Sequence, residues 1–179
     1  MRQHGFSLIE LLMGLAITGI VLQLVSPAFT TLIESNQSEQ AAQALFSGIR
    51  TARTEAIIRN QSVVIHGINR DWSQGWRIIL DISGKGDMDS NNPLLAERKS
   101  GARVSIVGNG PVVSFIRFRG QGESLFGGTL HICQAREPVS LHQVVLARTG
   151  RVSLRSDKAA QALCEERKRL RATSEHAVL

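Results

Sequence analysis

Few residues of this chain combine the types and spacing that catalysis requires. The five histidines, His4, His66, His131, His142 and His176, are scattered along the sequence. No nucleophile elbow, His-Glu-x-x-His pattern or phosphate-binding loop accompanies them. His66 and His131 fall inside predicted strands, where we expect hydrogen-bonded sheet residues rather than catalytic bases. The sequence therefore predicts a protein that is not an enzyme and needs no cofactor.

Glu10 has the most unusual surroundings of any ionisable residue. The four residues before it are uncharged, and the 23 residues from 11 to 33 that follow contain no charged side chain. A carboxylate in a membrane-embedded helix costs about 2–3 kcal/mol or more unless it is paired, so such a residue predicts a function. The alternative is that Glu10, near the start of the segment, reaches the membrane surface.

The uncharged segment itself predicts a single membrane span, because about 20 apolar residues cross a bilayer as a helix. No small-residue cleavage site of the secretory type follows it. Arg2 lies on the short N-terminal side, which predicts a cytoplasmic N-terminus and places the chain after about residue 34 outside the cytoplasm. Pro27, inside this helix, removes a backbone hydrogen bond and is expected to kink or locally open it.

The sequence His4-Gly5-Phe6-Ser7-Leu8-Ile9-Glu10-Leu11-Leu12 resembles the class III leader of type IV pilins and type II secretion pseudopilins. The resemblance implies that a prepilin peptidase cuts after Gly5 and that Phe6 becomes an N-methylated N-terminus. It also implies that Glu10 neutralises the terminal amine of a neighbouring subunit in a filament, where an unpaired charge is expensive. Pro27 corresponds to a helix-breaking proline of that family.

The rest of the chain predicts an α+β fold. Helical spacing of apolar residues continues to about residues 60–61, with the buried stripe made of Ala41, Ala42, Leu45, Ile49, Ala52 and Ala56. The period then changes, and strands are expected at residues 63–66, 76–82, 102–107, 112–118, 130–133, 143–147 and 151–154. Residues 157–171 have helical composition. We expect one long N-terminal helix packed on an antiparallel sheet.

This globular part resembles the GspH/FimT-type minor pilins and pseudopilins, a group that includes FimU-like proteins. The matching pieces are Arg53-Thr54-Glu55-Ala56, Gly75-Trp76-Arg77, residues 115–120, Cys133 and Arg148-Thr149-Gly150-Arg151-Val152. The expected organisation is a leader (1–5), a transmembrane and filament-core helix (6–33), a periplasmic head (34–165) and a basic tail (166–179). The expected partners are the prepilin peptidase, other filament subunits and the inner membrane.

Cys133 and Cys164 lie in the part of the chain that we expect outside the cytoplasm. An even number of cysteines in an oxidising compartment favours a disulfide, and one that closes this loop contributes about 3 kcal/mol or somewhat more. Free thiols are an alternative. A zinc site with His131 and His142 is another, although no Cys-x-x-Cys or His-x-x-x-His spacing supports it.

Residues 81–89 form a polar loop with alternating oxygen-bearing side chains, a feature of calcium-binding loops. The loop lacks the Asp-x-Asp-x-Asp-Gly pattern and the closing glutamate, and Lys85 stands where a ligand is needed. We therefore expect an acidic turn and no metal site.

The net charge of +6 is concentrated near the C-terminus. Residues 148–171 contain eight basic and three acidic residues, whereas the remainder contains 13 basic and 12 acidic residues. Some FimT-type minor pilins bind DNA through a Gly-Arg-x-Arg motif in this region, and here Ser153 replaces its second arginine. Arg151 and Arg155 would lie on one face of a strand, with Arg148 nearby. The alternatives are a sequence-blind phosphate contact by these three arginines and an ordinary solvated face.

Two functions follow from the resemblance. The first is a minor type IV pilin that takes part in starting or capping a pilus, with DNA capture as an added role. The second is a minor pseudopilin of type II secretion.

Overall fold

The computed structural model describes residues 8–101, 104–134 and 139–166, apart from the side chains of residues 22–28 and 31. The chain divides into two compact units, Met1–Asn36 and Gln37–Leu179. We call the second unit the head. Every residue of the buried apolar cluster belongs to the head, so the head builds its core without the first unit.

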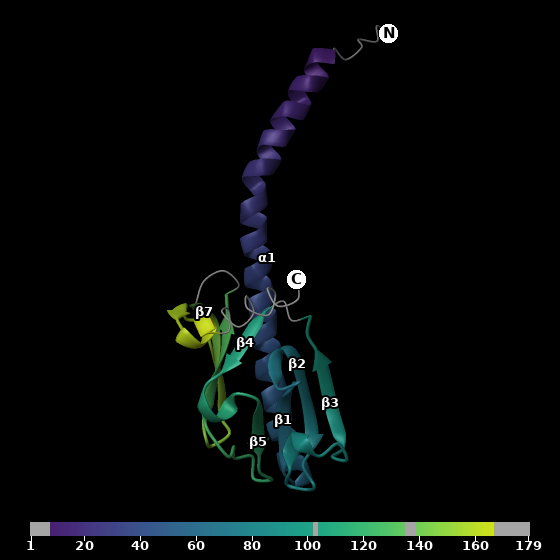
Figure 1. Cartoon of the computed structure of the whole chain (residues 1–179), viewed down its shortest axis with the longest axis vertical. Helices are drawn as coiled ribbons and strands as arrows, with labels where there is room; N and C mark the ends of the chain where they lie inside the picture. The colour runs from purple at the N-terminus through teal and green to yellow at the C-terminus, as the bar shows by residue number, and fades with distance from the viewer. Residues whose placement is uncertain (1–7, 102–103, 135–138, 167–179) are drawn as a thin grey trace. The chain divides into compact units, whose positions relative to one another are not determined.

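Helix α1 (Leu8–Arg59) begins in the first unit and ends in the head (Figure 1). The predicted stripe is confirmed, because Leu45, Ile49, Ala52 and Ala56 are almost fully buried. Asn60 ends the helix with a φ of +49°, the left-handed conformation that commonly closes a helix C-terminus. The chain then turns directly into the first strand.

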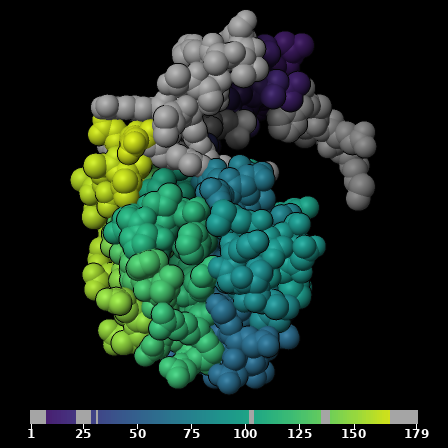
Figure 2. All heavy atoms as spheres, turned by 60° about the horizontal axis from the view of Figure 1, so that its bottom comes forward, coloured from purple at the N-terminus to yellow at the C-terminus, as the bar shows by residue number. Residues whose placement is uncertain are grey.

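Within the described residues, nine strands form two antiparallel sheets. The first sheet has the order β3-β2-β1-β5, and the second has the order β4-β6-β7-β8, with β9 pairing with β7. In chain order the strands are β1 (Val63–Ile68), β2 (Asp71–Leu80), β3 (Leu94–Lys99), β4 (Ser105–Gly108), β5 (Phe115–Phe118), β6 (Gly128–Cys133), β7 (Val139–Leu146), β8 (Val152–Arg155) and β9 (Ala159–Ala160). Figure 2 shows β2 and β3 (teal) and β7 and β8 (yellow-green) on opposite flanks of the head.

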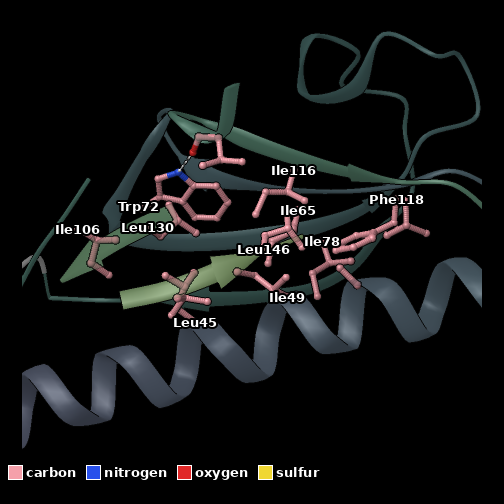
Figure 3. Packing of buried hydrophobic residues seen from close by; sticks show 14 of the residues in the cluster. Leu45, Ile49, Ile65, Trp72, Ile78, Ile106, Ile116, Phe118, Leu130 and Leu146 are labelled. Atoms are coloured by element: carbon pink, nitrogen blue, oxygen red, sulfur yellow. Dashed lines mark hydrogen bonds between the residues drawn. The ribbon is translucent and has the colours of Figure 1, made fainter. Parts of the chain in front are cut away.

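The core lies between α1 and the two sheets. In Figure 3, Leu45 and Ile49 of α1 face Ile78, Leu146 and other strand residues. Trp72 and Phe118 are the largest fully buried side chains. The Trp72 indole Nε1–H donates a hydrogen bond of 3.1 Å to the Val112 carbonyl oxygen, so the polar atom of this ring has a partner inside the core.

Two predicted elements are wrong in detail, and one strand was not predicted. Residues 94–99 form strand β3, which the sequence did not predict. Residues 110–112 form a 3-10 turn because Pro111 favours the first turn of a helix, so β5 begins only at Phe115 and not at residue 112. Residues 157–171 are not one helix: β9 occupies Ala159–Ala160, and only residues 162–166 are helical within the described part.

The expected membrane span covers residues 6–33. Within the described residues, we find no helix that combines the length and the apolar character needed to cross a membrane.

Candidate functional site

The first half of α1 presents apolar side chains that nothing in the described chain covers. They are between 49% and 77% exposed, and they are Leu8, Ile9, Leu11, Leu12, Met13, Leu15, Ile17, Ile20, Val21, Phe29, Leu32 and Ile33. Single exposed apolar residues are ordinary, but a contiguous surface of this kind marks an interface with protein or lipid. Glu10 lies in the first turn of this helix.

The predicted processing residues Gly5 and Phe6 lie outside the described residues. The backbone of α1 remains helical through Pro27, so this proline does not end the helix, and its side chain lies outside the described part.

The predicted disulfide between Cys133 and Cys164 is present, with a Cα–Cα distance of 5.6 Å. Cys133 is the last residue of β6, and Cys164 lies in the helical turn of residues 162–166, so the bond ties the C-terminal segment to the second sheet. The bond consumes both thiolates, so the alternative zinc site with His131 and His142 is wrong.

His131 lies beside this disulfide on β6 and is buried, and burial lowers the pKa of its imidazole. Its Nε2 atom lies 3.1 Å from Nε2 of Gln161, which suits a neutral ring that accepts the amide proton. In the first sheet, His66 Nδ1 lies 3.0 Å from the Gly67 carbonyl oxygen. Both histidines are strand residues with a hydrogen-bond partner in the head: His66 has one within β1, and His131 has one in Gln161, which follows β9.

An arginine side chain from strand β5 reaches into the polar loop that follows β2. Asp81 is buried, and its Oδ2 atom lies 3.0 Å from Nη2 of Arg117, which also donates to the Gly84 carbonyl oxygen at 2.9 Å. The other carboxylate oxygen accepts the Gly86 N–H at 2.9 Å. Arg117 of β5 therefore supplies the positive charge that pairs with the buried Asp81 carboxylate. The described residues contain no group of three or more His, Cys, Asp or Glu side chains placed to hold a metal ion.

The three predicted DNA-contacting arginines lie at the two ends of strand β8. Val152 and Leu154 pack against the core, and since side chains alternate along a strand, Ser153 and Arg155 point to the outer face. Arg151 immediately precedes the strand and Arg148 lies in the β7–β8 turn; both are exposed. None of the three forms an ion pair with a described residue.

The turn that carries Arg148 and Arg151 packs tightly against a second turn. Gly150 has a φ of +79°, and a Cβ atom there would lie 1.9 Å from the Gly122 carbonyl oxygen, so only glycine fits. Arg53 of α1 donates from Nε to the same Gly122 oxygen at 2.9 Å. The sequence did not predict this role for Arg53; the glycines on both turns were the available signal.

Arg119 is a further exposed basic residue on the second turn. The Ser124 N–H donates to the Arg148 carbonyl oxygen at 3.0 Å, and the Gly122 N–H donates to that of Arg119 at 2.7 Å. The structure thus brings Arg119 to the same end of the head as Arg148 and Arg151, while Arg155 lies at the far end of β8.

Two solved structures are similar to this chain in fold. Both are crystal structures of the type IV minor pilin FimU from Pseudomonas aeruginosa strain PAO1, one in space group P21 and one in P65. The first has a TM-score of 0.59 at 20% sequence identity, covering 73% of this chain and 98% of that chain. The second has a TM-score of 0.56 at 20% identity, covering 69% and 98%. The α+β fold of a long helix packed on antiparallel sheets is therefore a pilin fold.

Family comparisons agree with the fold. No curated protein matches the chain by sequence. Residues 1–22 match the prokaryotic N-terminal methylation motif, the segment in which Gly5, Phe6 and Glu10 lie. Residues 41–150, more than half of the chain, match the type II transport protein GspH. The chain therefore belongs to the GspH family of pilin-like proteins and carries a prepilin-type methylation motif.

Proposed function

We propose that this protein is a minor pilin that takes part in starting or capping a type IV pilus. Its action is assembly and not catalysis. The observation that carries the proposal is the set of exposed apolar side chains of α1 within residues 8–21 and 29–33, with Glu10 near its start. Such a surface is stable in water only when lipid or other helices cover it.

The order of events follows from this surface. We propose that residues 6–33 hold the subunit in the inner membrane, with the head in the periplasm, and that the prepilin peptidase removes residues 1–5. In the filament, helices of neighbouring subunits then replace lipid around α1. The uncharged run of residues 11–33 supports this order.

Glu10 gives the assembly its register. Cleavage after Gly5 leaves a positively charged amine on Phe6, inside an apolar bundle. A carboxylate from an adjacent subunit stabilises that amine strongly, because charges attract more in a low dielectric and an unpaired charge is costly there. Glu10 is the only acidic residue among residues 1–33.

A minor pseudopilin of type II secretion is the second candidate. The match of residues 41–150 to the type II transport protein GspH favours it. The mechanism of assembly through α1 and Glu10 would be the same, so the two candidates differ in the filament that the subunit joins.

DNA capture is proposed as an added role of the pilus subunit. Arg148, Arg151 and Arg155 are exposed, and no described acidic side chain neutralises them. Exposed guanidinium groups without an acidic neighbour bind the phosphates of DNA irrespective of the base sequence.

Glu10→Gln tests the assembly mechanism, because it removes the charge and keeps the size of the side chain. We expect the variant to be cut and methylated and to stay in the membrane, but to be lost from the sheared filament fraction on immunoblots. Glu34→Gln, the same change further along the helix, is the matched control. Incorporation of Glu10→Gln at the wild-type level would contradict the mechanism.

Deletion of the gene separates the two filaments. Loss of twitching or transformation with normal exoprotein release supports the pilus, whereas stalled exoprotein release with normal twitching supports secretion.

A further inference from the structure

A groove of about 450 Å³ opens in the head between α1 and strands β2, β3 and β4. Its floor is apolar and includes Leu45, Trp72 and Ile106, which Figure 3 shows together at one end of the core above α1. Its rim is polar and includes Gln37, Gln40 and Arg98. A concave apolar floor with a few polar groups at the rim is the usual form of a binding site.

Trp76 and Arg98 stand side by side in this groove. They are directly opposite each other in the β2–β3 pairing, and opposite residues share one face of a sheet. The Trp76 indole lies on Gly48 of α1, where an added Cβ atom would be 2.6 Å from the ring. The close packing on this glycine fixes the ring in place, and Trp76 remains partly exposed.

Arg98 is the one free charge that the described residues place in the groove. It is exposed and has no ion-pair or hydrogen-bond partner among them. Lys99 is the other basic residue that lines the groove. Its side chain, like that of Glu97, is on the opposite face of the sheet from Arg98, and its Nζ atom lies 3.5 Å from Glu97 Oε1. No described acidic residue lines the groove, and the carboxamides of Gln37 and Gln40 also have no described partner.

We propose that this groove binds an acidic segment of a neighbouring filament subunit. One carboxylate of that segment pairs with Arg98, and an adjoining apolar side chain packs against Trp76 and the floor. Arginine and tryptophan in one pocket are the residue types that dominate binding at protein interfaces, and the planar guanidinium fits a carboxylate with two hydrogen bonds.

The single free positive charge in the groove favours an acidic peptide segment over a nucleic acid strand. A nucleic acid strand is a line of phosphates and is held by several cations along a track, whereas this groove offers one free guanidinium beside apolar surface. A single carboxylate next to an apolar side chain matches both features.

The assignment of the acidic segment to a neighbouring subunit rests on the proposed function. Gln37 is the first residue of the head unit, so an occupant of the groove lies beside the point where α1 enters the head. In a filament held together by α1, a neighbouring subunit is close to that point. A weak contact is sufficient there, because assembly through the helices raises the effective concentration of the heads.

The chemistry is tested on the soluble head, residues 37–179, whose core is complete without the first unit. The probe is the peptide N-acetyl-Phe-Glu-amide, and its matched control is N-acetyl-Phe-Gln-amide. Binding is followed by indole fluorescence and by amide chemical shifts. We expect saturable millimolar binding of the glutamate peptide and about threefold to fivefold weaker binding of the glutamine peptide.

Two variants test whether the preference for the glutamate peptide arises in the groove. Arg98→Gln removes the difference between the peptides, and Lys99→Gln, the same change one residue away on the other face, keeps it. Equal binding of the two peptides to the native head overturns the proposal, as does an unchanged preference in Arg98→Gln. Tighter binding of the dinucleotide thymidylyl-thymidine would also overturn it and would point to a nucleic acid. Tighter peptide binding after deletion of residues 167–179 would identify this chain's own tail as the occupant.

The subunit source is tested in the full chain. A photo-crosslinking amino acid at Ser100, which lines the groove, should join the protein to a subunit that carries the methylation motif, and Arg98→Glu should abolish the product. A product with a protein that lacks the motif would overturn the assignment of the source. The head assay contains no residue 10, so its outcome is independent of the Glu10 experiment.

Discussion

Ser73 of β2 and Ile106 of β4 exchange two hydrogen bonds across the joint between the two sheets. The Ile106 N–H donates to Ser73 Oγ at 2.9 Å, and the Ser73 hydroxyl donates to the Ile106 carbonyl oxygen at 3.4 Å. Ser73 is fully buried. The edge strand β4 thus satisfies its backbone with a side chain of the other sheet.

Ser73→Ala is expected to lower the free energy of unfolding of the head by about 1–3 kcal/mol, because it leaves buried backbone groups of Ile106 without a partner. Urea denaturation of the two proteins measures the change. Ser62→Ala, which removes one 3.4 Å bond at a partly buried site, should cost less. An equal loss of unfolding free energy in both variants would show that the contact between the two sheets does not depend on the Ser73–Ile106 hydrogen bonds.

Replacing both Cys133 and Cys164 with serine is expected to destabilise the head by about 3–4 kcal/mol, because the bond restricts a loop of 31 residues in the unfolded chain. Urea unfolding with and without a reducing agent measures this. The reduced native protein should match the double variant. If reduction leaves the unfolding midpoint unchanged, the bond does not stabilise the head.

His131 gives the head a pH dependence near neutrality. Burial lowers the pKa of its imidazole in the native state, while a histidine of the unfolded chain titrates near 6.5. The unfolded state therefore binds more protons below about pH 6.5, so stability is fully present above that pH and falls as the pH drops through this window. His131→Gln should flatten the dependence of the urea midpoint between about pH 7.5 and 5.5; an unchanged dependence would contradict the assignment.

Two carboxylates, of the exposed Glu97 and the half-buried Asp89, change stability only at lower pH, outside the range in which His131 titrates. The hydrogen bond from Arg77 lowers the pKa of Glu97, and the Asn91 backbone N–H lowers that of Asp89. Their contributions are present above the ordinary carboxylate range and are lost as the pH falls below about 4.

The helix and the disulfide could be predicted from residue types and spacing alone. The spacing of Leu45, Ile49, Ala52 and Ala56 is visible in the sequence and needs no tertiary information. Cys133 and Cys164 are the only two cysteines, so a disulfide within the chain has one possible pairing.

Strand β3 and the groove depend on pairing that the sequence does not encode locally. Residues 94–99 lack strand alternation and end in the charged sequence Glu97-Arg98-Lys99; they form a strand because β2 pairs with them. Trp76 and Arg98 become neighbours only through that register. The division into two sheets is also a long-range result, because the hydrogen bonds between Ser73 and Ile106 join residues that are 33 positions apart.

Gly5→Val is expected to leave the precursor uncut, because the prepilin peptidase cleaves after this glycine in the proposed processing. Intact-mass measurement of the purified chain should show residues 1–5 still attached and no methyl group on Phe6. The native protein should lack residues 1–5 and carry the methyl group. Normal cleavage of Gly5→Val would reject the proposed cut site.

Replacing Arg148, Arg151 and Arg155 with alanine is expected to weaken binding of single-stranded DNA by the head. Three lost phosphate contacts should reduce the slope of log affinity against log salt concentration by roughly 2–3. Fluorescence anisotropy of a labelled oligonucleotide at several salt concentrations measures the slope. A second triple variant, Arg50→Ala, Arg59→Ala and Arg70→Ala, removes the same charge from exposed positions elsewhere on the head and controls for net charge. An equal loss of slope in both variants would mean that DNA responds to overall charge, and an unchanged slope in the first would reject the proposed DNA contact at β8.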